Sequence, residues 1–283
     1  MALTVNTNTT SLGVQKNLNR ASDALSTSMT RLSSGLKINS AKDDAAGLQI
    51  ANRMTSQIRG QTMAIKNAND AISIAQTAEG AMQEQTNILQ RMRELAIQAR
   101  NDSNTVDDRD ALDKEFQSMT KELDRIAAST QLNNKNLLDG STTTAMVFQV
   151  GSNTGSDNQI SITLTDAMST AGSLSALTSK AITGASSDIE ANFSGAMTAI
   201  DEALKNINTT RADLGAVQNR LTSTIANLQN INENAEAARG RVQDTDFAAE
   251  TAQLTKQQTL QQASTSVLAQ ANQLPSAVLK LLQ

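Results

Sequence analysis

The chain of 283 residues contains no cysteine, histidine, tryptophan or tyrosine, and only four phenylalanines. Without cysteine and histidine it has no imidazole base, no thiolate nucleophile, no Cys/His zinc site and no disulfide. Aspartate, glutamate, lysine and serine remain as possible catalytic groups, so enzymatic chemistry is restricted but not excluded. A compact domain of this length normally buries many aromatic rings, because each removes a large apolar area from water. We therefore expect a non-enzymatic protein without cofactor or metal, and without a compact globular core.

Basic stripes and long apolar runs are also missing. The net charge is -4 and the isoelectric point is near 5.0, which argues against a nucleic-acid partner. No apolar run approaches the roughly 20 residues that cross a bilayer, so we expect no membrane insertion. The first residues lack a charged region followed by an apolar one, so we expect no cleavable signal peptide. Composition alone leaves the cellular compartment open.

Apolar residues recur at intervals of three and four toward both ends of the chain, as on one face of an α-helix. The first run is Val14, Leu18, Ala21, Leu25, Met29, Leu32 and Leu36. A second run begins at Ile50 and reaches about Arg100, which predicts a helix of about 75 Å. A third run from Leu112 to Ile126 predicts a shorter helix.

The C-terminal half holds the most regular heptad pattern. Its seven-residue repeat comprises Phe193, Ile200, Ile207, Leu214, Leu221 and Leu228. The intervening line includes the polar residues Arg211, Gln218 and Asn232, which can fix register or partner choice at a cost in stability. A final run comprises Leu260, Val267, Ala271, Leu274, Val278 and Leu281. These long helices predict an elongated rod in which the N- and C-terminal helices lie side by side.

The middle of the chain has a different pattern. From Asp139 onward it is rich in serine, threonine and glycine, and the helical period disappears. Residues 145–150 and 159–164 resemble strands, and the link 151–158 has turn chemistry, so we expect a β-hairpin. Residues 166–187 are small and polar, which predicts a short variable surface loop.

The terminal helices are amphipathic but rich in polar residues. Helical stability in proteins comes mostly from packing of the apolar face, and an isolated pair of such helices buries little area. We therefore expect the ends of the chain to become ordered where further copies supply neighbours. From the residues alone, a polymerising subunit and a dimeric coiled-coil adaptor remain equally open.

The segment from Thr30 to Ala51, TRLSSGLKINSAKDDAAGLQIA, resembles bacterial flagellin of the short, Pseudomonas-like kind. The resemblance continues in ANRMTSQIRGQTMAIKNANDAISIAQTAEGAM, QRMRELAIQARN, TQLNNKNLLDG, FQVGSNTGSDNQI, RADLGAVQNRL, NINENAEAARGRVQDTDFAAET and QANQLPSAVLKLLQ. Only residues from about 166 to 190 have no counterpart in the family pattern.

The resemblance implies a mainly α-helical rod of the flagellin D0/D1 type. Residues 1–42 and 243–283 would form the D0 terminal coiled coil. Residues 43–165 and 188–242 would form the D1 helical bundle, with the β-hairpin near 145–165. The short segment 166–187 would replace any full outer domain.

The implied function is that of a structural subunit that polymerises helically into the flagellar filament used for motility. The implied location is the extracellular flagellum, reached through the flagellar export apparatus. The alternatives are a hook-filament junction protein, which shares the terminal motifs, and a cytosolic signalling coiled coil, for which only the periodicity matches. The implied partners are further copies of the chain, filament cap and hook-junction proteins, an export chaperone at the C-terminal helix, and host pattern-recognition receptors.

The acidic pair Asp43 and Asp44 can be read as a carboxylate site, a cation site or a helix start. We favour a helix start in which Ser40 is the N-cap and Asp43 closes a capping box. The resemblance further implies recognition of this segment by plant immune receptors. The residues carried over for that recognition are Arg31, Leu32, Ile38, Asp43, Asp44, Gly47 and Leu48.

A second candidate site comprises Arg91, Leu95 and Glu115. Arg91 and Leu95 are four residues apart on one face of a predicted helix, and Glu115 lies on the helix expected to return beside it. On the residues alone this is a solvated ion pair worth less than about 1 kcal/mol. The resemblance implies contact with the mammalian Toll-like flagellin receptor and with the neighbouring subunit.

The third candidate set is the coiled-coil core used for polymerisation. The tail could be a membrane-surface helix, but its only cation after Leu260 is Lys280, so a buried seam is favoured. The predicted core residues are Leu18, Leu25, Leu32, Leu260, Val267, Leu274 and Val278.

Overall fold

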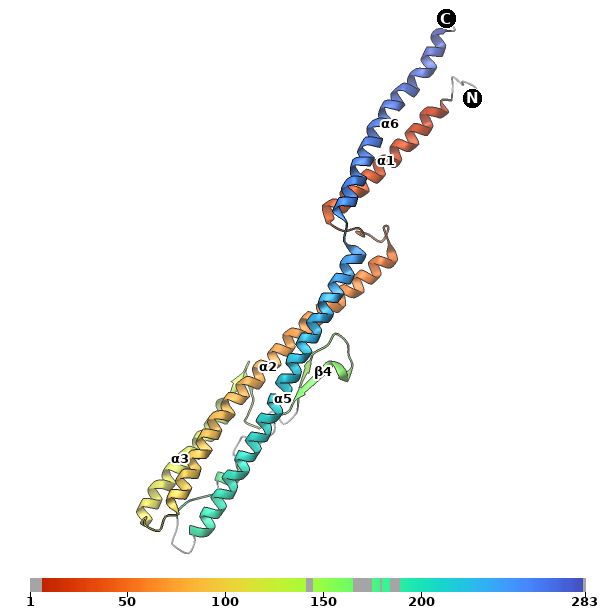
Figure 1. Cartoon of the computed structure of the whole chain (residues 1–283). Helices are drawn as coiled ribbons and strands as arrows, with labels where there is room; N and C mark the ends of the chain where they lie inside the picture. Colours follow the sequence, from red (N-terminus) through yellow and green to blue (C-terminus); the bar gives the residue numbers. More distant parts are fainter. Residues whose placement is uncertain (1–6, 141–144, 165–174, 179, 184–188, 282–283) are drawn as a thin grey trace. The chain divides into compact units, whose positions relative to one another are not determined.

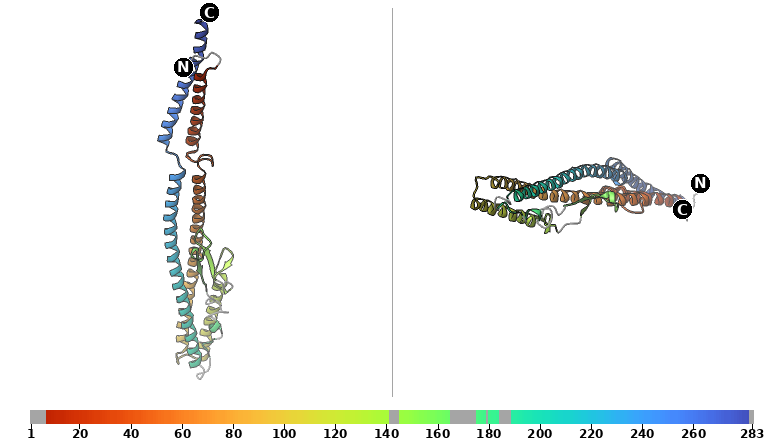
Figure 2. Two further views of the ribbon diagram at one scale, coloured as in Figure 1. Left: turned by 90° about the vertical axis from the view of Figure 1, so that its right-hand side faces the viewer. Right: turned by 90° about the horizontal axis from the view of Figure 1, so that it is seen from below.

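The computed structural model describes residues 7–140, 145–164, 175–178, 180–183 and 189–281. Its helices and strands are shown in Figures 1 and 2. The long helices are α1 (Thr9–Ser34), α2 (Ala45–Ala99), α3 (Val106–Ser129), α5 (Ile189–Gln243) and α6 (Phe247–Leu281). The predicted mainly α-helical class with a small β-hairpin is confirmed.

The chain divides into two compact units. The first unit comprises Met1–Ile58 and Glu233–Gln283, and the second comprises Arg59–Asn232. Helices α2 and α5 each contribute residues to both units.

In the second unit, α2, α3 and α5 share one hydrophobic core. The predicted heptad of α5 is confirmed, because its members from Ile200 to Leu228 are buried and Phe193 packs partly buried against the core. The largest fully buried side chains include Phe116 of α3 and Met82 of α2. Among the polar heptad residues, Gln218 donates to the Glu79 carboxylate at 2.9 Å.

The turn between α2 and α3 is fixed by capping at both helix ends. Arg109 is buried, and its guanidinium donates to the carbonyl oxygens of Ala99 (3.2 Å) and Asn101 (3.3 Å) after the last turn of α2. At the start of α3, Thr105 and Asp108 form a capping box. Polar groups at both ends are thereby satisfied, so the chain can reverse within a few residues.

The β-hairpin lies where the alternating pattern predicted it. Strands β3 (Met146–Gln149) and β4 (Gln159–Ile162) pair antiparallel, with Met146 opposite Ile162. A second, shorter hairpin was not expected, and it joins β1 (Gln131–Leu132) to β2 (Lys135–Asn136). Its two-residue turn places Asn133 and Asn134 at φ values of 50° and 61°, a left-handed conformation that asparagine tolerates.

The expectation of a surface loop over 166–187 is wrong for two aliphatic residues. Leu177, on the short helix α4 (Ser175–Thr178), is fully buried, and Ile182 is 3% exposed. The Ile182 amide donates to the Asp113 carboxylate at 2.8 Å, and Gln117 donates to the Lys180 carbonyl at 2.8 Å. Two isolated aliphatic residues suffice to anchor a polar segment on α3. Residues 166–174, 179 and 184–187 lie outside the described part of the chain.

In the first unit, α1 and α6 lie side by side and antiparallel (Figure 1). The Asn8 amide donates to the Ala271 carbonyl at 2.8 Å near the chain ends. Arg31 and Glu250 form an ion pair at 3.7 Å at the opposite end of the helix pair. The predicted pairing of the terminal helices is thereby confirmed.

The segments that follow α1 and precede α6 are joined through their backbones. Lys37 donates to the carbonyl of Gln243 at 2.7 Å, and Thr245 donates to the carbonyl of Gly35 at 3.0 Å. Gly35 ends α1 in the left-handed region at φ 72°, which a glycine adopts without steric cost.

Candidate functional site

The surface between α1 and α6 is a seam of small and polar side chains. On α6 the half-buried or buried positions follow a strict four-three spacing, and they are Glu250, Leu254, Gln257, Gln261, Ser264, Leu268 and Ala271. On α1 the predicted core residues Leu18, Leu25 and Leu32 are each half-buried. Met29, which the pattern placed in the same stripe, is 57% exposed, and Ser28 is buried instead.

Leu260 and Val267 do not lie in this seam. They are 44% and 46% exposed, so α1 does not cover them within one chain. The physical reason is rotation about α6, because the seam follows Leu254 and Leu268 and leaves a second apolar stripe uncovered. Whether contacts between copies bury this stripe stays a prediction. The side chains of Leu274 and Val278 lie outside the described part of the chain.

The segment after α1 folds into a turn before α2 begins. The Asp43 carboxylate accepts hydrogen bonds from the backbone amide of Ser40 (2.9 Å), the hydroxyl of Ser40 (3.1 Å) and the amide of Asn39 (3.2 Å). These hydrogen bonds to the charged form lower the pKa of Asp43, with the Ser40 amide as the largest cause. Asp43 therefore stabilises a turn and does not close a capping box inside the helix.

Helix α2 has its N-cap at Asp44 and not at Ser40, so that prediction is wrong. The Asp44 carboxylate accepts from the Gly47 amide at 2.9 Å, as an N-cap residue does. Gly47 is buried, and a Cβ there would lie 2.6 Å from the Ile38 Cδ1 and 2.5 Å from the Asp44 Oδ2. A larger residue would disturb the cap and the packing of Ile38 together. The sequence did carry a signal for this start, because Asp44 precedes two alanines, the strongest helix formers.

The predicted recognition residues thus form one local structure with unequal exposure. Asp43 and Asp44 are exposed, whereas Ile38 is 5% exposed and Gly47 is buried. The remaining three, Arg31, Leu32 and Leu48, are half-buried. Ile38 and Gly47 therefore shape the segment, and the carboxylates are its accessible groups.

The second candidate set is divided between surface and core. The Arg91 guanidinium donates to Glu94 at 3.0 Å and to Glu115 at 3.1 Å, which joins α2 to α3 at the surface. These bonds raise the pKa of Arg91 above its usual value, with the Glu94 bond as the largest cause. Leu95 is fully buried, so it cannot contact a receptor or another subunit through its side chain. The prediction is wrong for Leu95 because that residue packs in the core of the second unit.

The described residues contain neither a candidate metal site nor a candidate membrane span. In the described ranges, no cluster of three or more acidic, histidine or cysteine side chains could hold a metal ion. None of the described helices combines the length and apolar character needed to cross a bilayer.

Comparisons with known proteins point to one family. The family model of the bacterial flagellin N-terminal helical region matches residues 5–143, and that of the bacterial flagellin C-terminal helical region matches residues 197–282. Flagellin B of Vibrio anguillarum is 40% identical over 377 aligned positions, covering 100% of both chains. Flagellin A of Vibrio cholerae is 39% identical over 380 positions, again with full coverage of both.

Solved structures include a flagellin and a related flagellar protein. Bacillus cereus flagellin is 29% identical and covers 58% of this chain and 88% of its own, with a TM-score of 0.48. A putative flagellar hook-associated protein from Vibrio parahaemolyticus has a TM-score of 0.55 over 72% of this chain and 99% of its own. Its identity of 12% relates the two proteins by fold alone. Because both family models and the curated relatives are flagellins, the hook-junction and cytosolic alternatives are not favoured.

Proposed function

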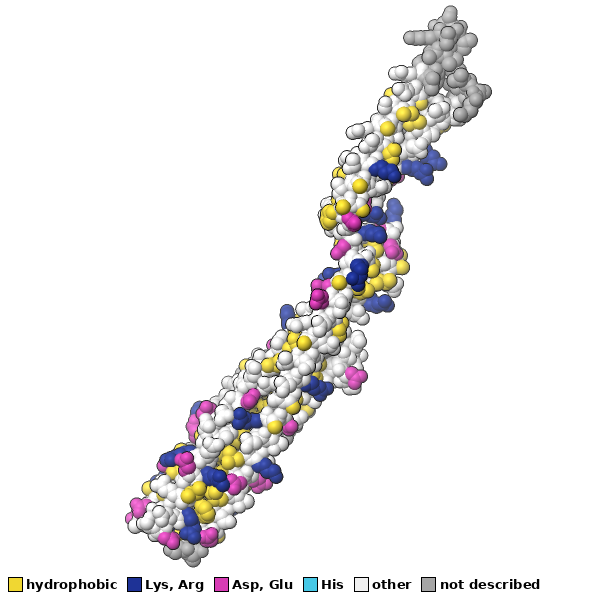
Figure 3. Space-filling view, in the orientation of Figure 1, with side chains coloured by type: hydrophobic (Ala, Val, Ile, Leu, Met, Phe, Trp, Pro, Cys, Tyr) yellow, Lys and Arg dark blue, Asp and Glu magenta, His cyan; other side chains and the backbone are white. Residues whose placement is uncertain are grey.

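The chain belongs to the bacterial flagellin family and is a structural subunit of the flagellar filament, and we propose that α1 and α6 complete their core with further copies of the chain. One observation carries this proposal: Leu260 and Val267 form an apolar stripe on α6 that α1 leaves exposed. Figure 3 shows apolar patches on the visible surface of this helix pair. Leu12 and Met29 of α1 are more than half exposed as well.

The interior of the helix pair is too small to be its main source of stability. Ala21, Ser28 and Ala271 are its buried positions within the described parts of α1 and α6. Fully burying a leucine or valine side chain contributes about 1.5–3 kcal/mol, and neither residue type is fully buried among the described side chains of α1 and α6. Burial of Leu260 and Val267 between copies would therefore couple folding of the ends to polymerisation.

We assign residues 1–42 and 243–283 to a D0 layer, and residues 43–165 and 188–242 to a D1 layer. The contiguous hydrophobic core between Ala68 and Leu221 supports the second assignment. The Vibrio alignments extend over 377 and 380 positions, whereas this chain has 283 residues. We place the additional residues of those relatives in the interval 144–196, which neither family model covers, so this chain is a short type without a full outer domain.

We further propose that the subunit has no catalytic activity and leaves the cell through the flagellar export apparatus. The uncovered stripe of α6 would suit an export chaperone that holds the C-terminal helix before assembly, and the assembled chain would meet cap and hook-junction proteins at the filament ends. Host receptors would reach the exposed carboxylates of Asp43 and Asp44, and the surface pair Arg91 and Glu115. Leu95 has no part in that surface.

Seeded polymerisation tests the role of the two ends. Filaments are dissociated by heat or acid, and full-length subunits are returned to native buffer with short filament seeds. We expect regrowth with the full chain and none with variants that lack residues 1–40 or 244–283, although the second unit of each should stay folded by circular dichroism. A trimmed variant that elongates seeds at the full-length rate would overturn the proposal.

A matched pair of variants separates the α6 stripe from apolar exposure in general. The double variant Leu260→Ser, Val267→Ser should fail to elongate seeds. Val147→Ser removes a more exposed apolar side chain from β3, at 59% exposure, and should elongate them. Loss of growth in both variants would remove the special role of α6.

A further inference from the structure

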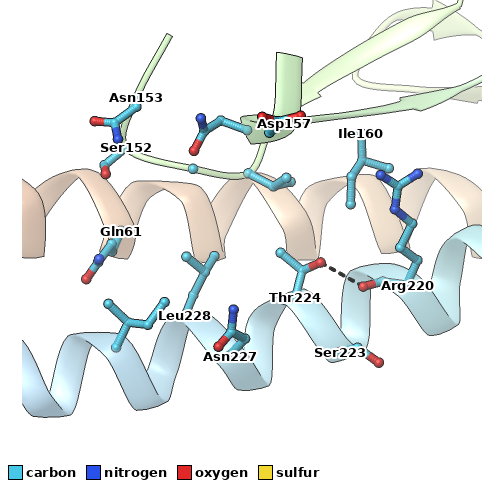
Figure 4. Close-up of a pocket in the computed structure, with 14 residues that line it drawn as sticks. Gln61, Ser152, Asn153, Asp157, Ile160, Arg220, Ser223, Thr224, Asn227 and Leu228 are labelled. Atoms are coloured by element: carbon cyan, nitrogen blue, oxygen red, sulfur yellow. Dashed lines mark hydrogen bonds between the residues drawn. The ribbon is translucent and has the colours of Figure 1, made fainter. Parts of the chain in front are cut away.

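Two segments from the middle of the chain cover the helices of the second unit, and they do so differently. The turn 151–158 of the β3–β4 hairpin lies over α2 and α5 and leaves an open cleft of about 530 Å³ between itself and these helices (Figure 4). The second segment comprises residues 175–178 and 180–183, and its side chains Leu177 and Ile182 are buried. We call this second segment the clasp, because it contacts both α3 and α5.

On the side of α3, the clasp is bonded to polar side chains that share one helix face. The Gln117 amide donates to the Lys180 carbonyl at 2.8 Å. The Ile182 backbone N–H donates to the Asp113 carboxylate at 2.8 Å. Asp113 and Gln117 are four residues apart and Asp110 precedes them by three, a spacing that places all three side chains on the same face of a helix. Helix α3 therefore presents a continuous polar stripe to the clasp.

Thr183 connects the clasp to both helices. Its hydroxyl donates to the Asp110 carboxylate of α3, and its carbonyl accepts from the Asn192 amide of α5 at 2.8 Å. The Lys180 side chain lies along α5 at Gly195, where an added Cβ would be 3.6 Å from the Cδ and Cε of the lysine. The clasp is thereby attached to α3 on one side and to α5 on the other.

Two apolar anchors keep the clasp in place between these bonds. Leu177 and Ile182 belong to the same buried cluster as Phe116 of α3 and Ile200 of α5. Hydrogen bonds near a surface contribute little by themselves, because water competes for the same groups. Burial of the two aliphatic side chains therefore supplies most of the energy that holds the clasp, and the hydrogen bonds fix its position.

Helix α3 is also bonded to α2, the helix that precedes it in the chain. The Arg109 guanidinium donates to the Ala99 carbonyl at 3.2 Å, and the Arg91 guanidinium donates to Glu115 at 3.1 Å. These bonds join α3 to α2, whereas the clasp joins α3 to α5. The two sets of bonds therefore attach α3 to different neighbours.

We propose that the clasp is a catch for α3. Helix α3 can leave the bundle as a unit only when the clasp is released, and until then α2, α3 and α5 stay together. Release of α3 would also separate Glu115 from Arg91, so the clasp preserves this surface pair. The proposal concerns a single chain and does not rest on filament assembly.

Hydrogen exchange of the folded monomer tests the catch with a matched pair of variants. Ile182 of the clasp and Ile160 of the hairpin lie in the same core cluster and are both 3% exposed. We expect Ile182→Ala to speed exchange of the α3 amides near Phe116 and Leu123 by about tenfold or more at low urea, because the clasp is weakened. Ile160→Ala should leave those amides within about threefold of the parent, because the hairpin turn covers α2 and α5.

Two outcomes would overturn the proposal. If both variants speed exchange of α3 equally, α3 opens only with the whole unit and the clasp has no special hold on it. If α3 exchanges at the parent rate in Ile182→Ala, the clasp does not restrain it. The filament function stands in either case, because the measurement uses the unassembled monomer.

A milder variant keeps the test valid if Ile182→Ala does not fold. Asn192→Ala removes the bond from α5 to the Thr183 carbonyl and leaves both apolar anchors of the clasp in place. It should speed exchange of the α3 amides by about two- to tenfold, as expected for the loss of one hydrogen bond. Asn219→Ala removes an exposed amide elsewhere on α5 and should leave α3 exchange unchanged. Equal exchange of α3 in these two variants would contradict the attachment of α3 to α5 through the clasp.

Discussion

The two units of this subunit differ in what fills their interiors. The second unit has a contiguous core of aliphatic side chains together with Phe116, and many of these are fully buried. The α1–α6 pair of the first unit has a seam in which Gln257, Gln261 and Ser264 lie in succession between the half-buried Leu254 and Leu268. The core of the second unit can therefore stabilise an isolated chain, whereas the helix pair has an exposed apolar surface that we propose further copies cover.

The largest expected contrast comes from removing one side chain from each unit. Phe116→Ala should destabilise the second unit by about 3–5 kcal/mol, because it removes a fully buried ring and leaves a cavity. Leu18→Ala truncates a half-buried side chain in the helix pair and should cost the monomer less than about 1 kcal/mol. Urea denaturation of the monomer followed by circular dichroism measures both. An equal cost at the two positions would contradict the difference between the units.

The next contrast compares the effect of one double variant on monomer stability with its effect on filament assembly. Leu260→Ser with Val267→Ser should leave monomer unfolding within about 0.5 kcal/mol of the parent, because both side chains are already exposed. The same change should raise the critical concentration for filament growth more than about tenfold, since each 1.4 kcal/mol of lost contact energy is a factor of ten. Sedimentation of filaments at increasing subunit concentration gives this value. An unchanged critical concentration would mean that the stripe stays exposed in the filament.

The sequence predicted the second unit better than the first. A regular heptad from Phe193 to Leu228 and the alternating strand at 159–162 each had one apolar face, and burial followed that face. On α6 two stripes compete, one with Leu254 and Leu268 and one with Leu260 and Val267. Periodicity shows that both stripes exist, but only the position of α1 decides which one is covered.

For the candidate site residues too, the sequence pattern left more than one arrangement possible. The chemistry of residues 40–44 predicted a helix start with Ser40 as its N-cap, but the adjacent Asp43 and Asp44 could each serve as a cap. Hydrogen-bond geometry assigned Asp43 to the turn and Asp44 to the helix. Leu95 was carried over as a surface residue by resemblance, yet its four-residue distance from Arg91 allows one side chain in the core and one in solvent.

A smaller effect is expected at the start of α2, in the first unit. Asp44→Ala removes the side-chain cap and should cost about 0.5–2 kcal/mol of local stability. Thr105→Ala removes the corresponding cap of α3 in the second unit and is the matched control. Hydrogen exchange of amides in the first turn of each helix reports the loss. We expect α2 to fray further than α3, because α3 is also held by Phe116 and Leu123; equal fraying would contradict this.

Acid should affect the two units through carboxylates whose pKa is lowered by hydrogen bonds. The pKa of Asp43 lies below 3.8 because of bonds from Ser40 and Asn39, and that of Asp108 lies below 3.8 because of bonds from Thr105. A lowered folded-state pKa stabilises the fold above pH 3.8, and that contribution disappears as the pH falls through the lowered value. Amide chemical shifts of Ser40 and Thr105, followed by NMR from pH 6 to about 2, measure each titration.

We expect both amides to titrate below pH 3.8, and the turn of residues 39–43 to open while α3 stays packed. Asp43→Asn should remove the titration of Ser40 and leave that of Thr105 intact. A Ser40 titration at or above pH 3.8 would be incompatible with the hydrogen bonds that Asp43 accepts.

The smallest effect is expected at the surface of the second unit, where Arg91 bridges α2 and α3. Its partners Glu94 and Glu115 are 68% and 42% exposed, and water screens such pairs, so Arg91→Ala should leave the free energy of unfolding nearly unchanged. Leu95→Ala, four residues away and fully buried, should cost about 2–5 kcal/mol in the same urea measurement. A large loss from Arg91→Ala would mean that the bridge belongs to the core. A small loss of stability from Arg91→Ala, together with reduced binding to a host flagellin receptor, would mean that Arg91 acts in recognition at the surface. Leu95 would then act in folding alone.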